Sequence, residues 1–214
     1  MKYKNLLFDL DGTLTDSSEG IIKCVLYTYE KMQLTPPGES ELFTFIGPPL
    51  SQSFVKHGVP ENDKDRAVAI YRERYNSIGK FENAPYPGMV ELLQKLKDDG
   101  FKLYVATSKP EKTAIEVLEH FNMEGYFDEI AGATFDSSRV NKEDVIRYLL
   151  DKTEANDAET VMIGDTNFDV LGAAELGIPC IAVTWGFGDA KEMEKAGAVS
   201  IVDDMDELYE AVNK

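Results

Sequence analysis

The sequence predicts an α/β protein, in which a parallel sheet carries helices on both faces and a small all-helical domain is inserted after the first strand. Two observations predict this fold. From residue 85 to the C-terminus, helical and strand patterns alternate almost without interruption. Residues 16–80, by contrast, show helical patterns and no strand pattern. A chain of 214 residues is long enough for one such core and one small accessory domain.

The first strand ends in two acids. Leu6, Leu7, Phe8 and Leu10 form a short, nearly continuous apolar run, which is typical of a central parallel strand covered on both faces. The run is interrupted by Asp9 and Asp11, and Gly12 lets the backbone turn sharply behind them. Side chains two apart on a strand share a face, so we expect both carboxylates to reach one point. A bound cation, or protonation of one acid, would relieve their repulsion.

The helical insert begins directly after this strand. Asp16-Ser17-Ser18-Glu19 predicts an N-cap with a capping-box acid, and apolar residues then recur at helical spacing until Thr35-Pro36-Pro37-Gly38. Three shorter amphipathic stretches follow at residues 40–45, 50–57 and 62–78, separated by glycine and proline turns. We therefore expect a helical domain at residues 16–80 and a discontinuous α/β domain made of residues 1–15 and 81–214.

The remaining elements of the sheet domain follow from the alternating pattern. Strands are expected at residues 101–106, 129–133, 160–163, 179–183 and 199–202, and helices at 89–98, 110–121, 142–152, 168–176, 190–196 and from 206 onward. Ligands of such sheets bind beyond the carboxyl ends of the strands. The first strand must therefore be central if its acids are to belong to the site.

The composition excludes several classes of partner. With 22 basic and 39 acidic residues the formal net charge is -17, which argues against a nucleic-acid polymer or an anionic membrane. No apolar run has membrane-spanning length and no signal-type stretch precedes the first strand, so we expect a cytoplasmic protein, monomeric or weakly dimeric. Cys24 and Cys180 lack the spacing of a metal site and are interpreted as core residues. An anionic substrate would need local cations to offset the net charge.

A second strand end carries hydroxyl groups. The strand at 101–106 runs into Thr107-Ser108-Lys109-Pro110, and Pro110 suits the first position of a helix. Hydroxyl groups and free backbone N–H groups at such a point can hold a phosphate. Taken alone, Thr107 and Ser108 could equally cap the helix.

Two further strand ends supply a cation and a second pair of acids. Lys142 lies in the first turn of a helix, where the helix dipole disfavours a positive charge, and this misfit is the argument for a function. A solvated surface lysine is the simpler alternative, and Arg139 is a rival cation. Gly164-Asp165 ends an apolar strand, and Asp169 follows on the first turn of the next helix. The carboxylates of Asp9, Asp165 and Asp169, with the backbone oxygen of Asp11, are hard ligands of the kind Mg²⁺ takes.

These motifs resemble those of a known family. Asp9-Leu10-Asp11-Gly12-Thr13-Leu14-Thr15-Asp16 after an apolar strand resembles the signature of the haloacid dehalogenase superfamily of aspartate-nucleophile phosphotransferases, whose core is Rossmann-like. The other motifs of the family are matched in order over nearly the whole chain: Thr107 with Ser108, Lys142, and Gly164-Asp165 with Asp169.

The resemblance implies a mechanism. Asp9 would be the nucleophile that becomes an aspartyl phosphate, and Asp11 would protonate the leaving group and then deprotonate the attacking water. The Mg²⁺ ion, Lys142, Thr107 and the Ser108 backbone would hold the transferring phosphoryl group. The helical insert resembles the family's cap, which closes over the site and selects the leaving group.

The leading hypothesis is a Mg²⁺-dependent phosphomonoesterase for a small phosphorylated metabolite, resembling the phosphoglycolate phosphatase and 5′-nucleotidase branch. Thr13 resembles the phosphatase form of the signature, which disfavours the alternative of a phosphosugar mutase. Dehalogenases and phosphonatases lack an acid at the position of Asp11, so the presence of Asp11 disfavours them. A non-catalytic binding protein, a third alternative, would be expected to have lost a motif acid, and none is missing here.

The substrate is predicted from possible contacts of the insert. Lys23, Gly47 and Lys109 are the candidate contact residues. The segment Leu42–Leu50 carries apolar side chains and no cation, so it suits a nucleoside, whereas Lys23 and Lys109 could serve the carboxylate of 2-phosphoglycolate. We therefore expect a preference for a nucleoside 5′-monophosphate.

Overall fold

The computed structural model describes residues 2–134 and 138–214 of the chain. The chain divides into two compact units: residues 1–15 with 85–214, the sheet unit, and residues 16–84, the helical unit. The crossings between the units fall within two short strands, β2 (Thr15–Asp16) and β3 (Ala84–Pro85). Among the described helices, none combines the length and the apolar character needed to cross a membrane.

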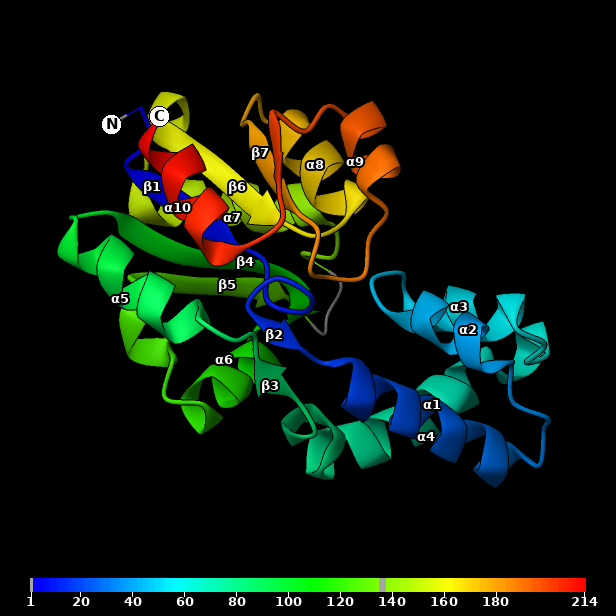
Figure 1. The fold of residues 1–214 in the computed structure, drawn as a ribbon. Helices are drawn as coiled ribbons and strands as arrows, with labels where there is room; N and C mark the ends of the chain where they lie inside the picture. The colour runs from blue at the N-terminus through cyan, green and yellow to red at the C-terminus, as the bar shows by residue number, and fades with distance from the viewer. Residues whose placement is uncertain (1, 135–137) are drawn as a thin grey trace. The chain divides into compact units, whose positions relative to one another are not determined.

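The sheet unit contains six parallel strands in the order β5-β4-β1-β6-β7-β8. Strand β1 thus lies in the interior of the sheet, between β4 and β6, as the sequence predicts (Figure 1). Strands β4 and β5 follow on one side of β1, and β6, β7 and β8 lie on its other side. Ligand sites of open α/β sheets form where the strand order reverses in this way. The strands are β1 (Asn5–Phe8), β4 (Lys102–Pro110), β5 (Glu129–Ala133), β6 (Thr160–Gly164), β7 (Cys180–Val183) and β8 (Ser200–Val202).

Helices cover both faces of the sheet, and each face has its own apolar core. Leu6 and Phe8 of β1 pack in one cluster with α5, α6 and α10, whereas Leu7 packs in the other with α7, α8 and α9. The strand alternation expected of a two-sided core is therefore present. The helices are α5 (Met89–Asp98), α6 (Glu111–His120), α7 (Lys142–Thr153), α8 (Asn167–Ala174), α9 (Ala190–Ala196) and α10 (Met205–Asn213), with 3-10 turns η4 (Glu124–Tyr126) and η5 (Asp157–Glu159).

The helical unit is held by aromatic packing. Its elements are α1 (Ser18–Met32), α2 (Glu39–Leu42), η1 (Phe43–Phe45), α3 (Leu50–Lys56), η2 (Glu61–Asp63), α4 (Lys64–Ser77) and η3 (Gly79–Phe81). The ring of Phe54 is fully buried and contacts those of Tyr29, Phe45 and Tyr71. Tyr75 stacks on Tyr71 at 5.3 Å, as expected for two residues one helical turn apart.

Two details of the helical unit differ from the expectation. Ser17 is the N-cap of α1 but makes no side-chain cap hydrogen bond; instead Asp16 accepts one from the Ser18 N–H at 3.0 Å. The second detail is on α4, where the Arg74 guanidinium forms a two-pronged pair with Glu82, at 2.6 and 3.1 Å. This pair ties the residues after Lys80 to the helical unit, so the unit extends to residue 84.

Candidate active site

The site begins with Asp9, the first residue after β1. Its backbone N–H donates to the Ile163 carbonyl of β6 at 2.9 Å, which continues the strand pairing for one more residue. The side chain is buried, with 8 % of the residue exposed. Asp9 therefore lies at the carboxyl end of an interior strand, the edge at which parallel sheets bind ligands.

Asp165 and Asp169 reach the same point from β6 and α8. Asp169 is the third residue of α8, and its Oδ2 accepts hydrogen bonds from the Thr166 N–H at 3.0 Å and the Thr166 hydroxyl at 2.8 Å. This capping box turns the carboxylate back over the strand end. A Cβ on Gly164 would lie 2.3 Å from the Asp169 carboxyl carbon, so only glycine permits this approach.

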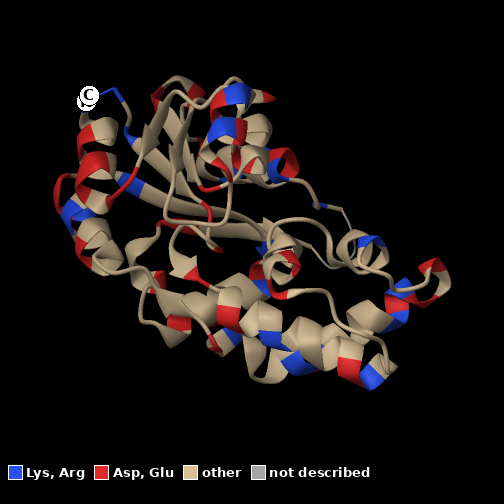
Figure 2. Cartoon of the chain, turned by 45° about the vertical axis from the view of Figure 1, so that its right-hand side comes forward, with Lys and Arg blue, Asp and Glu red and all other residues tan. Residues whose placement is uncertain are grey.

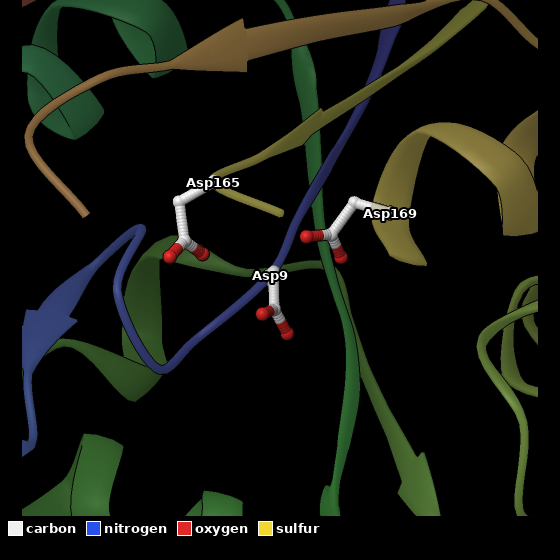
Figure 3. Close-up of side chains that lie close together, drawn as sticks. All are labelled: Asp9, Asp165 and Asp169. Carbon is white, nitrogen blue, oxygen red and sulfur yellow. The ribbon is translucent and has the colours of Figure 1, made fainter. Parts of the chain in front are cut away.

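The three carboxylates form one cluster. Asp9, Asp165 and Asp169 each offer an oxygen atom, and these atoms lie within 4.8 Å of one another. Figure 3 shows the three side chains close together, carried by the end of β1, the end of β6 and the start of α8. All three are buried, and buried carboxylates require compensation by a cation or a proton.

Lys142 supplies part of this compensation. Its Nζ lies 2.8 Å from Asp9 Oδ1 and 2.7 Å from Asp169 Oδ1, and it donates a hydrogen bond to the Ala106 carbonyl at 3.0 Å. Gly172 of α8 makes room for the lysine stem, because a Cβ there would lie 2.7 Å from Lys142 Cβ. The unusual position of a lysine in the first turn of α7 is thus explained by two carboxylates that it contacts.

Arg139, the rival cation, is directed elsewhere. Its Nε donates to the Gly132 carbonyl at 2.6 Å, and its guanidinium pairs with Glu111 and lies on the Tyr148 ring. Figure 2 shows acidic residues on helices of both units with basic residues among them. The cations that meet the site acids are therefore buried lysines of the sheet unit, and this local arrangement, unlike the net charge, favours an anionic substrate.

The electrostatics of the cluster follow from burial. Burial raises the pKa of Asp9 to about 6, although Lys142 opposes the shift. Burial, with the charges of Asp169 and Asp9, raises the pKa of Asp165 well above its usual value, although the Phe187 N–H and the Thr13 hydroxyl oppose this shift. Burial disfavours the charged form of Lys142, but Asp169 and Asp9 outweigh it and raise the pKa of the ammonium group.

The cluster has the properties of a divalent-cation site. Asp9 Oδ1 and Asp169 Oδ1 are buried; each lies close to the Lys142 ammonium group, but neither accepts a hydrogen bond of good geometry from the described residues. Three carboxylates and one ammonium group leave two negative charges, which one divalent cation would neutralise. Carboxylate oxygens are the donors that Mg²⁺ prefers, so the residues fit this ion.

Asp11 does not join the cluster with its side chain, contrary to the expectation that both acids reach one point. Strand β1 ends at Phe8, so Asp9 and Asp11 do not share a regular strand. The chain turns at Gly12, which has φ of +88° and donates to the Thr15 carbonyl at 2.8 Å. The Asp11 carboxylate instead lies 2.5 Å from Lys109 Nζ.

Thr107 and Ser108 also lie at this edge of the sheet but do not cap the following helix. Strand β4 continues to Pro110, which is the N-cap of α6 and not its first residue as expected. Thr107 is buried and its hydroxyl accepts from the Lys109 N–H at 3.2 Å, whereas Ser108 is exposed. Capping, the simpler alternative, thus does not explain these two hydroxyl groups.

Lys23 and Gly47 belong to the helical unit. Lys23 pairs with Glu19 at 2.5 Å and with Glu82 at 3.0 Å. Gly47 is exposed with φ of +101°, and no atom would contact a Cβ there. The apolar segment around it, expected to form a substrate wall, is largely internal: Leu42, Phe45 and Ile46 are buried.

Two further groups shape the site and were not predicted as site residues. The Phe187 N–H donates to Asp165 Oδ2 at 2.8 Å, and the Thr13 hydroxyl donates to Asp165 Oδ1 at 3.1 Å. The loop after β7 approaches Asp165 so closely that a Cβ on Gly186 or Gly188 would clash with it. In the sequence, the two glycines that flank Phe187 were the signal that this loop approaches another part of the chain closely. Trp185, in the same loop, donates from its indole N–H to the Thr13 carbonyl at 3.0 Å.

Comparisons with known proteins agree with this geometry. Residues 6–183 match the profile of the haloacid dehalogenase-like hydrolase family. The chain is 43 % identical over 194 residues to a 5′-nucleotidase of Pseudomonas aeruginosa, covering 90 % of this chain and 88 % of that protein. It is 39 % identical over 210 residues to the tyrosine-protein kinase PtkA of Mycobacterium tuberculosis, covering 97 % of this chain and 72 % of the kinase.

A solved structure shows the same fold over the full length. The predicted phosphatase from Clostridium acetobutylicum superposes with a TM-score of 0.93 and is 43 % identical, covering 100 % of this chain and 99 % of that one. The family match spans most of the chain, from the first strand to the end of β7. The chain belongs to the haloacid dehalogenase-like hydrolase family and is a phosphatase of that family.

Proposed function

We propose that this phosphatase hydrolyses phosphomonoesters with Mg²⁺ through an aspartyl phosphate on Asp9, and that its preferred substrates are nucleoside 5′-monophosphates. The observation that carries the proposal is the convergence of Asp9, Asp165, Asp169 and Lys142 on one buried point at the switch of the sheet. Such an arrangement suits a transferring phosphoryl group, whose catalysis is mostly positioning and charge neutralisation.

In the first step a carboxylate oxygen of Asp9 attacks phosphorus and the bond from phosphorus to the leaving oxygen breaks. Asp11 gives its proton to that oxygen. In the second step water attacks the aspartyl phosphate, its proton passes to Asp11, and Asp9 is released as a carboxylate. Lys142, Thr107 and the Ser108 backbone hold the phosphoryl oxygens. Bound Mg²⁺, held by Asp9, Asp165, Asp169 and the Asp11 backbone oxygen, would neutralise charge on the phosphoryl group.

The helical unit, in this proposal, is a cap over the site that excludes water and selects the leaving group. Its position after the first strand supports this role. The exposed Phe43, of which 48 % is accessible, offers a ring to a nucleoside.

The preference for a nucleotide rests on the ion pairs that the candidate lysines already form within the protein. The carboxylate of 2-phosphoglycolate would need a positive partner if it were buried. Lys23 is already paired with Glu19 and Glu82, and Lys109 is paired with Asp11. The similarity to a protein named 5′-nucleotidase supports the same choice.

The test is a panel of phosphomonoesters assayed with the purified chain and Mg²⁺. We expect kcat/KM for at least one nucleoside 5′-monophosphate to exceed that for 2-phosphoglycolate and for hexose phosphates. Interconversion of sugar phosphates without net release of phosphate would favour a mutase instead, and a clear preference for 2-phosphoglycolate that is lost in Lys23→Ala would reverse the order of substrates.

A further inference from the structure

We infer that Lys109 is a positioning residue for Asp11: it holds the Asp11 carboxylate apart from the Asp9, Asp165 and Asp169 cluster, in the place from which it serves the leaving oxygen. The inference rests on the proposed function, in which Asp11 is the proton donor. It replaces the expectation that Lys109 contacts the substrate.

The first observation is the pairing itself. Lys109 Nζ lies 2.5 Å from Asp11 Oδ1, and only 5 % of the lysine side chain is exposed. Burial of a lysine is costly unless a partner compensates it, so a contact at this depth is specific and not a passing surface pair. Asp11 itself keeps 20 % of its side chain exposed, enough to meet a bound ligand.

The second observation is that β4 is irregular where it delivers Lys109. Thr107 pairs with Gly132 and Pro110 with Ala133, so β4 carries two extra residues, Ser108 and Lys109, relative to β5. A bulge of this kind redirects a side chain. Here Thr107 and Lys109 are both buried, while Ser108 between them is exposed.

The third observation is that the neighbouring strand is shaped to accept the bulge. A Cβ on Gly132 would lie 2.5 Å from the Lys109 carbonyl oxygen and 2.7 Å from the Glu111 backbone. Glycine at this position therefore permits the backbone path that aims Lys109 at Asp11. The Thr107 hydroxyl, which accepts from the Lys109 N–H, supports the same path.

The geometry explains why two acids so close in sequence take different surroundings. Without the Lys109 ammonium group, the Asp11 carboxylate would be free to turn toward the three-carboxylate cluster and the cation that this cluster would hold. Asp11 would then no longer point at the leaving oxygen. Lys142 pairs with Asp9 and Asp169, so each of the two lysines is assigned to different acids.

The test is the leaving-group dependence of Lys109→Met, a variant of similar length without the charge. An alkyl leaving group needs a proton, whereas p-nitrophenolate does not. We expect kcat/KM for a nucleoside 5′-monophosphate to fall on the order of 100-fold, and that for p-nitrophenyl phosphate to fall by only about threefold. Lys109→Arg, which keeps a cation, should recover part of the loss on the nucleotide.

Two other variants separate positioning from general damage. Gly132→Ala keeps Lys109 in the sequence but displaces the bulge that aims it at Asp11, so it should show the same selective loss on the nucleotide. Lys102→Met breaks a lysine–aspartate pair on the same strand, the exposed contact with Asp128 at 3.1 Å, and should leave both substrates unchanged. Equal losses on both substrates in Lys109→Met, or no loss on either, would overturn the inference.

Crystal structures of the wild type and Lys109→Met decide the matter without turnover. We expect the Asp11 carboxylate to pair with Lys109 in the wild type and to leave that position in the variant. An unmoved Asp11 in the variant would refute the positioning role. If the wild type hydrolysed no phosphomonoester, the proposed function would fail, but these two structures would still show whether Lys109 holds Asp11.

Discussion

The two units of this chain bury different kinds of side chain. In the sheet unit, Asp9, Asp165, Asp169, Lys109 and Lys142 are buried together at one edge of the sheet. In the helical unit, whose residues are all described, the buried charged side chain is that of Lys80, which lies over the Phe81 ring. The interior of the helical unit is instead built from packed aromatic rings.

The difference shows which side chains stabilise each unit and which side chains lower its stability. Buried charges are costly unless they are fully compensated, and sites that bind and react with ligands accept that cost. Packed rings stabilise a fold without such a cost. The acids of the sheet unit should therefore matter most for activity, and the rings of the helical unit most for stability.

The largest expected effect is that of Asp9→Asn. The amide cannot form an acyl phosphate, so turnover should fall on the order of 10⁴-fold or more. Removal of one buried negative charge should leave the metal-free protein at least as stable, because Lys142 keeps its contact with Asp169. Steady-state kinetics and thermal unfolding measure the two quantities. Activity near that of the wild type, with deamidation excluded, would remove Asp9 as nucleophile.

Metal removal should come next. We expect excess EDTA to lower turnover on the order of 10³-fold and Mg²⁺ to restore it, with Ca²⁺ a poor substitute because of its larger and looser coordination shell. Asp165→Asn should weaken Mg²⁺ binding more than Asp169→Asn. Titration calorimetry of both variants measures this order. Undiminished rates in EDTA would contradict the assignment of the cluster as a metal site.

A change in the helical unit should show the opposite pattern to Asp9→Asn. Phe54 is fully buried among three aromatic rings, so Phe54→Ala should lower the free energy of unfolding by about 3 to 5 kcal/mol. Phe43→Ala, at an exposed ring of the same unit, should cost less than about 0.5 kcal/mol. Urea unfolding of both variants measures the difference, and equal losses would show that ring burial does not stabilise this unit.

The pH dependence of stability offers a smaller test of the sheet unit. The pKa of Asp9 is raised by burial from 3.8 to about 6, so between these values the folded metal-free protein binds more protons than the unfolded chain. The contribution of Asp9 is therefore complete below about pH 4 and is lost as the pH rises through about 6, by up to about 3 kcal/mol. Asp165 acts in the same direction.

The measurement is urea unfolding in EDTA between pH 5 and pH 7. Stability should decrease with rising pH in the wild type, less so in Asp9→Asn, and not at all with saturating Mg²⁺, which binds the ionised acids. Identical slopes in wild type and variant would show that Asp9 does not titrate in this range.

Much of the fold could be predicted because the local pattern of apolar residues indicates where each helix and strand lies. Helices α5 and α9 and strand β5 have the expected bounds, and β1 is interior as its apolar run indicates. Boundaries moved where a tertiary contact outweighed the local pattern. The clearest case is the end of the helical unit, where the Arg74–Glu82 pair holds residues beyond the expected limit at residue 80.

By itself the sequence determined the order of strands and helices and which acids and lysines stand at the strand ends, since both follow from local apolar periodicity. Only the tertiary structure decided which lysine meets which acid. Asp9 and Asp11 are two residues apart, yet they pair with different lysines. Because of the turn at Gly12 and the bulge in β4, Asp11 pairs with Lys109, whereas Asp9 pairs with Lys142. Turns and bulges interrupt strand alternation, and their outcome depends on glycines such as Gly132 that matter only through neighbours distant in sequence.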